Sequence, residues 1–272
     1  MAQPAHPKAH CAPPAIEFIA VDKRFRLKDS DQDLLAASQV SFSVAESEVV
    51  SLIGPSGCGK STLLNLGSGL TQPSAGTVRV AGATVRGPNP QVAFMLQKDL
   101  LMPWRTVQRN IEFGLELRGV GATERARTAQ RLLTQCRLSG FADHYPHQLS
   151  GGMRQRAALA RTLAVDPLVL LMDEPFSALD AQTKMILQQD LARTVAEQRK
   201  TVLFITHDLA EAVALSDRIL VMSERPGTIA ATISVDLADR DNPMARRRNP
   251  ALTHYVNELM GLLKLDAGTE LH

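Results

Sequence analysis

Residues 49–66 read VVSLIGPSGCGKSTLLNL, and this stretch decides the fold. A short apolar run leads into a glycine-rich loop of the pattern G-x-x-x-x-G-K-[ST], and residues that favour a helix follow it. Glycines let such a loop curl so that its N–H groups face a phosphate chain, and the next helix directs its positive end at the same anion. The stretch therefore predicts a nucleoside triphosphate site between a buried strand and a helix.

Each part of this loop has a predicted contact with the nucleotide. Lys60 supplies a point charge to the β- and γ-phosphates, and the hydroxyl of Ser61 is a ligand for Mg²⁺. We interpret Cys58 as a small filler whose exposure makes it open to alkylation, and not as a catalytic thiol. The predicted nucleotide-binding residues of the loop are Gly54, Pro55, Ser56, Gly57, Cys58, Gly59, Lys60, Ser61 and Thr62.

Polar side chains follow three further apolar runs. LVLLM leads into Asp173 and Glu174, TVLFIT leads into His207, and VAFML leads into Gln97. Ligands of parallel sheets bind at the carboxyl ends of the strands, so these side chains are expected at one edge. Asp173 is predicted to hold the Mg²⁺ shell, and Glu174 to orient or deprotonate the attacking water. His207 is a further catalytic candidate, and the amide of Gln97 could reach either Mg²⁺ or that water.

A second Ser-Gly-Gly turn opens a basic helix in HQLSGGMRQR, residues 147–156. Such a helix terminus can hold a phosphate, although the chain already has a nucleotide site. A helical insertion, predicted over residues 101–161, would carry this turn away from the first site. The economical explanation is that the turn binds the γ-phosphate of a nucleotide held by a second copy, in a symmetric head-to-tail pair.

The remaining pattern predicts an α/β domain over residues 16–235. Short β-branched runs alternate with helical stretches, and the N-terminal section alternates more strictly, as in an antiparallel flap. Residues 219–235 predict a closing hairpin with Pro226-Gly227 at its turn. Residues 1–15, rich in Pro, Ala and His and without an apolar signal core, are expected to be a disordered leader. Residues 236–272 form a C-terminal extension.

Composition excludes several classes of protein. The chain has 272 residues, of which 44% are hydrophobic, so it can bury a substantial core. A net charge of +2 without a long basic stripe gives no footprint for nucleic acid. Three widely spaced cysteines favour a reducing compartment, and the apolar runs are too short to cross a bilayer. We expect a cytosolic chain, and we interpret the run Arg246–Arg248 as a solvated face.

Six motifs occur in a fixed order, namely GPSGCGKST, Gln97, LSGGMRQR, LVLLMDEP, SALD and His207. Together they resemble the ATP-binding subunit of an ABC transporter, and the likeness covers about residues 16–235. The resemblance implies a P-loop NTPase (RecA-like) core with an antiparallel β subdomain and an inserted α-helical subdomain. ATP and Mg²⁺ are the implied cofactors.

The resemblance also assigns roles to residues outside the phosphate loop. Phe25 falls where the family places an aromatic ring that stacks on adenine. The signature motif that contacts the ATP of the partner copy matches Leu149, Ser150, Gly151, Gly152 and Met153. The loop that passes information between the two sites matches Ser177, Ala178, Leu179 and Asp180.

The finer resemblance is to the importers of nitrate, sulfonate and taurine. It rests on LLMPWRTVQRNI, on Met153 and on MDEPFSALD. Ser177 stands where this group often has Gly, and Ser47 precedes Glu48 where Gly-Glu is usual. Neither departure is expected to touch the chemistry, although the second puts the turn before the first core strand in doubt. Related ATPases for thiamine precursors or aromatic acids share these motifs, so the substrate stays open.

This resemblance implies the subunit that hydrolyses ATP to energise uptake of a small solute. Its partners would be a second copy, a separate multi-spanning permease and, indirectly, a solute-binding protein. It would act as a peripheral protein on the cytoplasmic face of the inner membrane. Trp104 falls in the region that borders the groove for a permease helix, and the alternative is a core Trp that shields the helical insertion.

Three other functional classes compete with the importer. A soluble ABC-type ATPase acting on nucleic acid or ribosomes is disfavoured by the short, heptad-free insertion, the single nucleotide site and the near-neutral charge. A simple P-loop kinase leaves the turn at Ser150 unexplained. An exporter ATPase is possible in principle, but the LMPW segment favours an importer.

Overall fold

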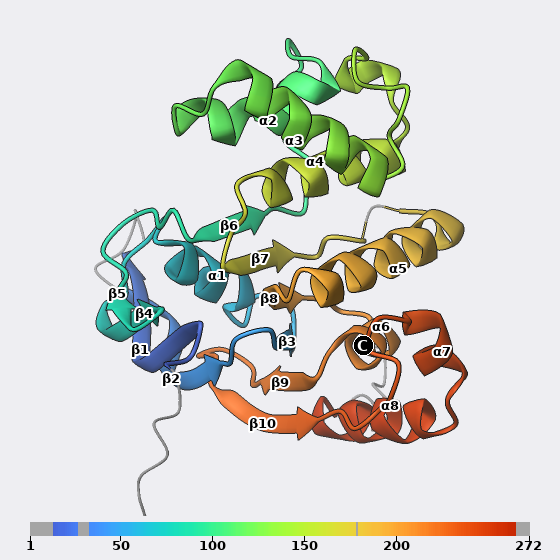
Figure 1. The fold of residues 1–272 in the computed structure, drawn as a ribbon. Coiled ribbons are helices and arrows are strands. Elements are labelled where there is room, and N and C mark those ends of the chain that lie inside the picture. The colour runs from blue at the N-terminus through green and yellow to red at the C-terminus, as the bar shows by residue number, and fades with distance from the viewer. Residues whose placement is uncertain (1–12, 27–32, 178, 265–272) are drawn as a thin grey trace, which may run out of the picture.

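A computed structural model describes residues 13–26, 33–177 and 179–264 of the chain. Its centre is a six-stranded sheet in the order β10-β9-β3-β8-β7-β6 (Figure 1). The strands of this sheet are β3 (Val49–Ile53), β6 (Val92–Met95), β7 (Val169–Asp173), β8 (Thr201–Ile205), β9 (Arg218–Met222) and β10 (Ile229–Ser234). All neighbours pair in parallel except β9 and β10. Every residue of β3 and β8 is buried, which explains their continuous apolar sequences.

A second sheet is antiparallel and has the order β2-β1-β4-β5. Its strands are β1 (Ile16–Arg26), β2 (Asp33–Val44), β4 (Ala75–Val80) and β5 (Ala83–Thr84). Phe18 and Phe42 stack with ring centroids 4.5 Å apart, and Phe18 belongs to the same core cluster as Leu63 and Leu64 of α1 (Lys60–Ser68). The predicted antiparallel flap is therefore present. It packs on the helix that follows the phosphate loop.

A helical subdomain stands above the β6 side of the large sheet (Figure 1). It contains α2 (Val107–Leu117), α3 (Ala122–Gln135), the short helix η1 (Pro146–Gln148) and α4 (Gly151–Ala164). Ile111, Leu132 and Leu133 are fully buried in its core. The predicted helical stretch over residues 101–161 contains α2 and α3, while α4 continues to Ala164 and packs against β6.

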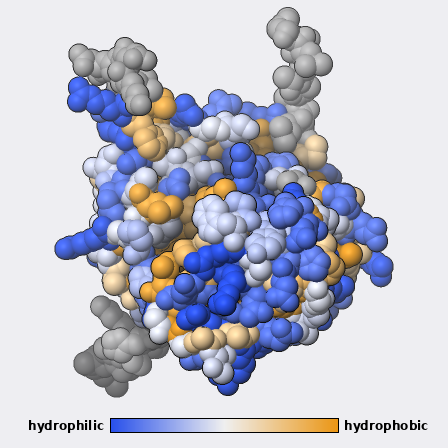
Figure 2. Space-filling view, turned by 90° about the horizontal axis from the view of Figure 1, so that it is seen from above, coloured by the Kyte–Doolittle hydropathy of each residue, from blue (hydrophilic) through white to orange (hydrophobic). Residues whose placement is uncertain are grey.

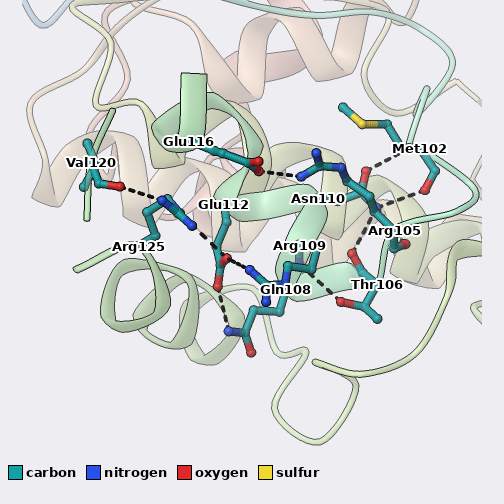
Figure 3. Close-up of polar contacts among 10 residues, drawn as sticks. All are labelled: Met102, Arg105, Thr106, Gln108, Arg109, Asn110, Glu112, Glu116, Val120 and Arg125. Atoms are coloured by element: carbon teal, nitrogen blue, oxygen red, sulfur yellow. Dashed lines mark hydrogen bonds and ion pairs between the residues drawn. The ribbon is translucent and has the colours of Figure 1, made fainter. Parts of the chain in front are cut away.

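A buried amide shapes the entry to this subdomain (Figure 3). The side chain of Asn110 accepts a bond from the N–H of Met102 at 2.8 Å. It donates to the carbonyl oxygens of Met102, Arg105 and Thr106 at 3.0 to 3.2 Å. These bonds fix the backbone around Trp104, whose side chain is 74% exposed. The core alternative for Trp104 is therefore wrong.

A buried carboxylate joins the first two helices of the same subdomain. Glu112 accepts bonds from Gln108 at 2.7 Å and from Arg109 at 3.1 Å, and Arg125 of α3 approaches it to 4.0 Å (Figure 3). A buried carboxylate is tolerated only when it is paired in this way.

Seen from the helical end, the molecule is mainly hydrophilic, with small scattered hydrophobic patches (Figure 2).

Ser47 lies in the turn before β3 and adopts a left-handed backbone with φ of +61°. Glycine takes this conformation without strain, which explains why Gly-Glu is usual there. Ser47 keeps the turn through two bonds: its N–H donates to Thr201 Oγ1 at 2.9 Å, and its hydroxyl donates to the Arg199 carbonyl at 3.0 Å. The turn is therefore preserved with serine in place.

The C-terminal residues complete the far side of the sheet. The helices there are α5 (Ala181–Glu197), α6 (Leu209–Leu215), α7 (Pro243–Arg248) and α8 (Ala251–Leu262). Leu259 of α8 is fully buried in one cluster with β9, β10 and α6. The predicted hairpin is the pair β9–β10, joined by residues 223–228. Within the described part of the chain, no helix combines the length and the apolar character needed to span a membrane.

The prediction of a solvated Arg246–Arg248 face is wrong for Arg246, which is buried. Its guanidinium donates to the carbonyl oxygens of Leu237, Ser216 and Ala238 at 2.7, 2.8 and 3.0 Å. A charge run in sequence gave no sign that three carbonyls would converge on its first member. The bond to Ser216, which lies just before β9, ties the extension to the large sheet.

We predict that Arg246→Ala lowers the free energy of unfolding by about 3 kcal/mol, because it leaves buried carbonyl groups without donors. Arg248→Ala, two residues away and exposed, should change it by less than about 0.5 kcal/mol. Urea denaturation followed by far-UV circular dichroism measures both. Equal effects of the two substitutions would contradict the anchoring role of Arg246.

Candidate nucleotide-binding and catalytic site

The phosphate loop lies between the end of β3 and the start of α1, at one end of a cavity of about 300 Å³. Gly57 and Gly59 have φ of +75° and +104°, a region that favours glycine. A Cβ on Gly59 would come within 2.7 Å of the Ala36 carbonyl of β2, so both conformation and packing require glycine there. The cavity is lined by Phe25, Leu34, Ala36, Ser56, Gly57, Gly59, Lys60, Ser61, Thr62, Glu174, Ile205 and Arg225.

The side chain of Lys60 folds back onto the phosphate loop. Its Nζ donates to the carbonyl oxygens of Gly54 and Pro55 at 2.8 Å each. The thiol of Cys58 lies below it and is 1% exposed, so the prediction that this thiol is open to alkylation is wrong. The Cys58 sulfur packs beside Gly54 and Met222, in the core between the loop and β9.

Phe25, by contrast, is 39% exposed at the wall of the cavity, beside Lys23.

Four predicted polar residues meet at the edge of the large sheet. The Nε2 atom of Gln97 lies 3.1 Å from Oε2 of Glu174, and Nδ1 of His207 lies 3.4 Å from the same oxygen. Asp173, one residue before Glu174, is the last residue of β7. Burial raises the pKa of Asp173, and the side chain of Ser61 opposes that rise. Gln97, Glu174 and His207 therefore converge on one point, where Glu174 also borders the cavity.

Ser177 belongs to this cluster as well. Its hydroxyl lies 3.3 Å from Nε2 of Gln97 and donates to the Glu174 carbonyl at 3.1 Å. The expectation that the change from Gly to Ser lies away from the chemistry is therefore wrong for this position. Further along the loop, Asp180 caps α5 by accepting from the N–H of Thr183 at 3.0 Å, and bonds to Thr183 lower the pKa of Asp180. Ala178 lies outside the described residues.

The Ser150 turn is not part of this cavity. Ser150 caps α4 by accepting from the N–H of Met153 at 3.3 Å. Gly151 is exposed and lines a different cavity, of about 620 Å³, together with Gln97 and Leu100. Leu149 is buried in the core of the helical subdomain. One copy thus brings the loop and the sheet-edge residues together but leaves the Ser-Gly-Gly turn outside their cavity.

Sequence reasoning missed the residues of α4 that hold the segment after Gln97. Gln155 is buried and donates to the carbonyl oxygens of Gln97 at 3.2 Å and of Pro175 at 3.1 Å. Arg161 donates to the carbonyls of Asp99 and Leu100 at 2.7 Å each. The basic character of this helix is visible in the sequence, but that pattern predicts only anion binding and not these bonds to backbone carbonyls.

A polar network also supports the segment after His207. Lys184 of α5 lies 2.8 Å from Asp208 and 2.8 Å from the buried Glu211. Glu211 accepts a further bond from Gln188, which in turn accepts from Arg247 of α7. Burial opposes the charge of Lys184, but the bonds to its two carboxylates outweigh it, so its pKa is raised. The contribution of the Lys184 charge to stability is therefore complete below the ordinary pKa of lysine and is lost as the pH rises through its raised pKa.

We predict that Lys184→Met lowers the free energy of unfolding by about 2 kcal/mol, because it strands the carboxylate of Glu211 in a buried site. Lys200→Met removes a lysine paired with the exposed Asp166 and should cost less than about 1 kcal/mol. Chemical denaturation at pH 7 compares the two variants. If Lys184→Met lowered the free energy of unfolding no more than Lys200→Met, the network would not support the segment after His207.

A comparison with known sequences places this geometry among related proteins. Residues 37–177 match the family model described as ABC transporter. An uncharacterized ABC transporter ATP-binding protein of Methanocaldococcus jannaschii is 46% identical over 84% of this chain and 84% of its own length. The nitrate import ATP-binding protein NrtD of Synechocystis is 42% identical over 85% of this chain and 89% of its own length. The taurine import ATP-binding protein TauB of Yersinia pestis is 44% identical over 75% of this chain and 80% of its own length.

A solved structure shares the fold. It is a dimeric post-hydrolysis state of an ATP-binding cassette bound to ADP and Pi, with a TM-score of 0.73 and 31% identity. The match covers 82% of this chain and 99% of that one. The α/β fold with a P-loop core and the likeness to nitrate and taurine importers, both inferred from the motifs, are confirmed.

Proposed function

Since the chain belongs to the ABC transporter family as an ATP-binding subunit with ATPase activity, we propose that it energises import of a small solute through a separate membrane permease. The observation that carries the hydrolytic part is the Glu174 carboxylate at the cavity wall, with Gln97 and His207 within 3.4 Å of one of its oxygens. The nitrate and taurine importers among its relatives support the direction of transport.

The proposed chemistry assigns one task to each side chain. The loop N–H groups and Lys60 bind the phosphates, and Phe25 stacks on the adenine. Glu174 orients the attacking water and accepts its proton, while His207 holds the carboxylate and the γ-phosphate in place. Glu174 lines the same cavity as the loop, and Gln97 and His207 contact its carboxylate, so we expect a nucleotide seated on the loop to have its last phosphate near Glu174.

The residues present also fit a magnesium ion. Ser61, Gln97 and Asp173 offer a hydroxyl, an amide and a carboxylate oxygen, which are the donors this hard cation prefers, and the Ser61 side chain acts to lower the pKa of Asp173. Bound Mg²⁺ would neutralise charge on the phosphates during transfer. We assign these three residues to the ion.

A second copy would complete the site. The Ser150 turn lies outside the cavity of its own copy, although its cap geometry suits an anion. We assign Leu149 to Met153 to contact with the partner's ATP, with Ser177 to Asp180 linking the two sites. The related cassette that is dimeric supports this arrangement.

The permease would dock beside the segment after Gln97. The 620 Å³ cavity, which includes Leu100, lies between this segment and α4, and Trp104 is exposed on the loop that follows. We propose that the protein acts peripherally on the cytoplasmic face of the inner membrane, with a solute-binding protein as an indirect partner. A small solute of the nitrate, sulfonate or taurine type is the proposed cargo, with a thiamine precursor or an aromatic acid as the alternative.

We predict that Glu174→Gln keeps ATP affinity within about threefold and lowers turnover by roughly 10²- to 10⁴-fold, because the amide cannot accept the proton of the water. Calorimetric titration with ATP and a phosphate-release assay measure the two quantities. Turnover at the wild-type rate would show that Glu174 has been given the wrong role.

A pull-down from gently solubilised membranes of the native host tests the transport assignment. With tagged chain, we expect a multi-spanning permease, and Trp104→Ala should reduce its recovery about tenfold, as for an aromatic interface anchor. Leu70→Ala, which removes another exposed apolar side chain, should not reduce it. Recovery of ribosomes, DNA or soluble proteins alone would favour the soluble ATPase and overturn the importer.

A further inference from the structure

The turn between β9 and β10, residues 223–228, packs directly against the phosphate loop. Nε and Nη2 of Arg225 donate to the carbonyl oxygen of Gly57 at 3.0 and 2.6 Å. Two residues later, a Cβ on Gly227 would come within 2.0 Å of the Cys58 carbonyl. The turn therefore contacts two successive peptide groups of the loop, from a segment about 170 residues away in sequence.

This turn is itself held in place. Gly227 donates to the Ala36 carbonyl of β2 at 3.1 Å, and its own carbonyl accepts from the N–H of Ser38 at 3.0 Å. Within the turn, the hydroxyl of Ser223 accepts from the N–H of Thr228 at 3.0 Å. Arg225 is thus presented from a segment with bonds to both sheets, and the direction of its side chain is set by the two bonds to Gly57.

The peptide between Gly57 and Cys58 is the group that Arg225 controls. In a trans peptide the N–H points away from the C=O, so fixing the carbonyl of Gly57 also fixes the N–H of Cys58. Gly57 is at φ of +75° and, as a glycine, would otherwise leave this peptide free to rotate. The N–H of Cys58 has only a long contact of 3.4 Å to the Pro55 carbonyl, which a phosphate oxygen can replace.

Charge adds to this orientation. A guanidinium bound to the carbonyl polarises the peptide and makes its N–H a stronger donor. Arg225 also lines the nucleotide cavity together with Lys60 and Ser61. Neither the orientation nor the polarisation of this peptide involves the attacking water or the carboxylate of Glu174. Both are therefore expected to change the affinity for nucleotide and not the rate of hydrolysis.

We propose that Arg225 is a positioning residue for nucleotide binding: it holds the Gly57–Cys58 peptide in the orientation that receives the phosphate chain. The proposal rests on the proposed role of residues 54–62 in binding nucleotide. It predicts a split between affinity and turnover, which a residue that only stabilises the fold would not produce.

The test uses the purified full chain and four variants, Arg225→Ala, Arg225→Lys, Arg193→Ala and Lys60→Ala. We expect Arg225→Ala to raise the Kd and the KM for ATP about tenfold, as for a hydrogen bond from a charged donor, with kcat changed less than twofold. Arg225→Lys should recover part of the affinity, because it keeps the charge and one donor. Arg193→Ala, which removes an exposed arginine of α5, should leave Kd unchanged.

The outcomes separate the two proposals. If Lys60→Ala weakens ATP binding while Arg225→Ala leaves Kd within twofold, the role of Arg225 is overturned and that of the loop stands. If neither variant weakens binding, the loop assignment fails and the proposal fails with it. A fall in kcat and in melting temperature with unchanged Kd would make Arg225 a structural residue and likewise overturn the proposal.

Discussion

The parallel pairing of β3, β8 and β7 is the constraint from which the rest of the site follows. These strands are short and buried, so their carboxyl ends stop at nearly the same level of the sheet. The register places Asp173 opposite Ile205, two residues before His207. The phosphate loop begins where β3 ends, at the same edge of the sheet. The loop therefore lies at the same edge as two acids, Asp173 and Glu174, that are more than one hundred residues away in the sequence.

Much of this arrangement could be predicted from the sequence, because it depends on local patterns. The continuous apolar runs, the glycine-rich loop and the polar residue after each run are visible without a structure. Parallel strands then bring Gln97, Glu174 and His207 together by a general rule of sheets. The outcome was a correct fold and a cluster whose members indeed meet, although their roles are still proposals.

The errors have a common physical origin in packing and side-chain-to-backbone contacts that no sequence motif records. Cys58 is buried because β9 and the turn after it pack below the loop, and Arg246 is buried because three carbonyls converge on it. Gln155 looks like an ordinary helical residue until its amide is found between two loops. No periodicity or motif within ten residues of these positions carries that information.

The close packing of Gly152 has a mechanical consequence. A Cβ at this position would lie 2.2 Å from the Cγ2 atom of Thr183, so α4 and α5 touch where even a methyl group would not fit. Thr183 is also the residue whose N–H is held by Asp180. A movement of α4 toward α5 could not be absorbed by free space at this contact and would push on the first turn of α5. The start of α4 and the first turn of α5 are therefore sterically coupled, so a displacement of α4 toward α5 would be transmitted directly to the residues that follow Asp180.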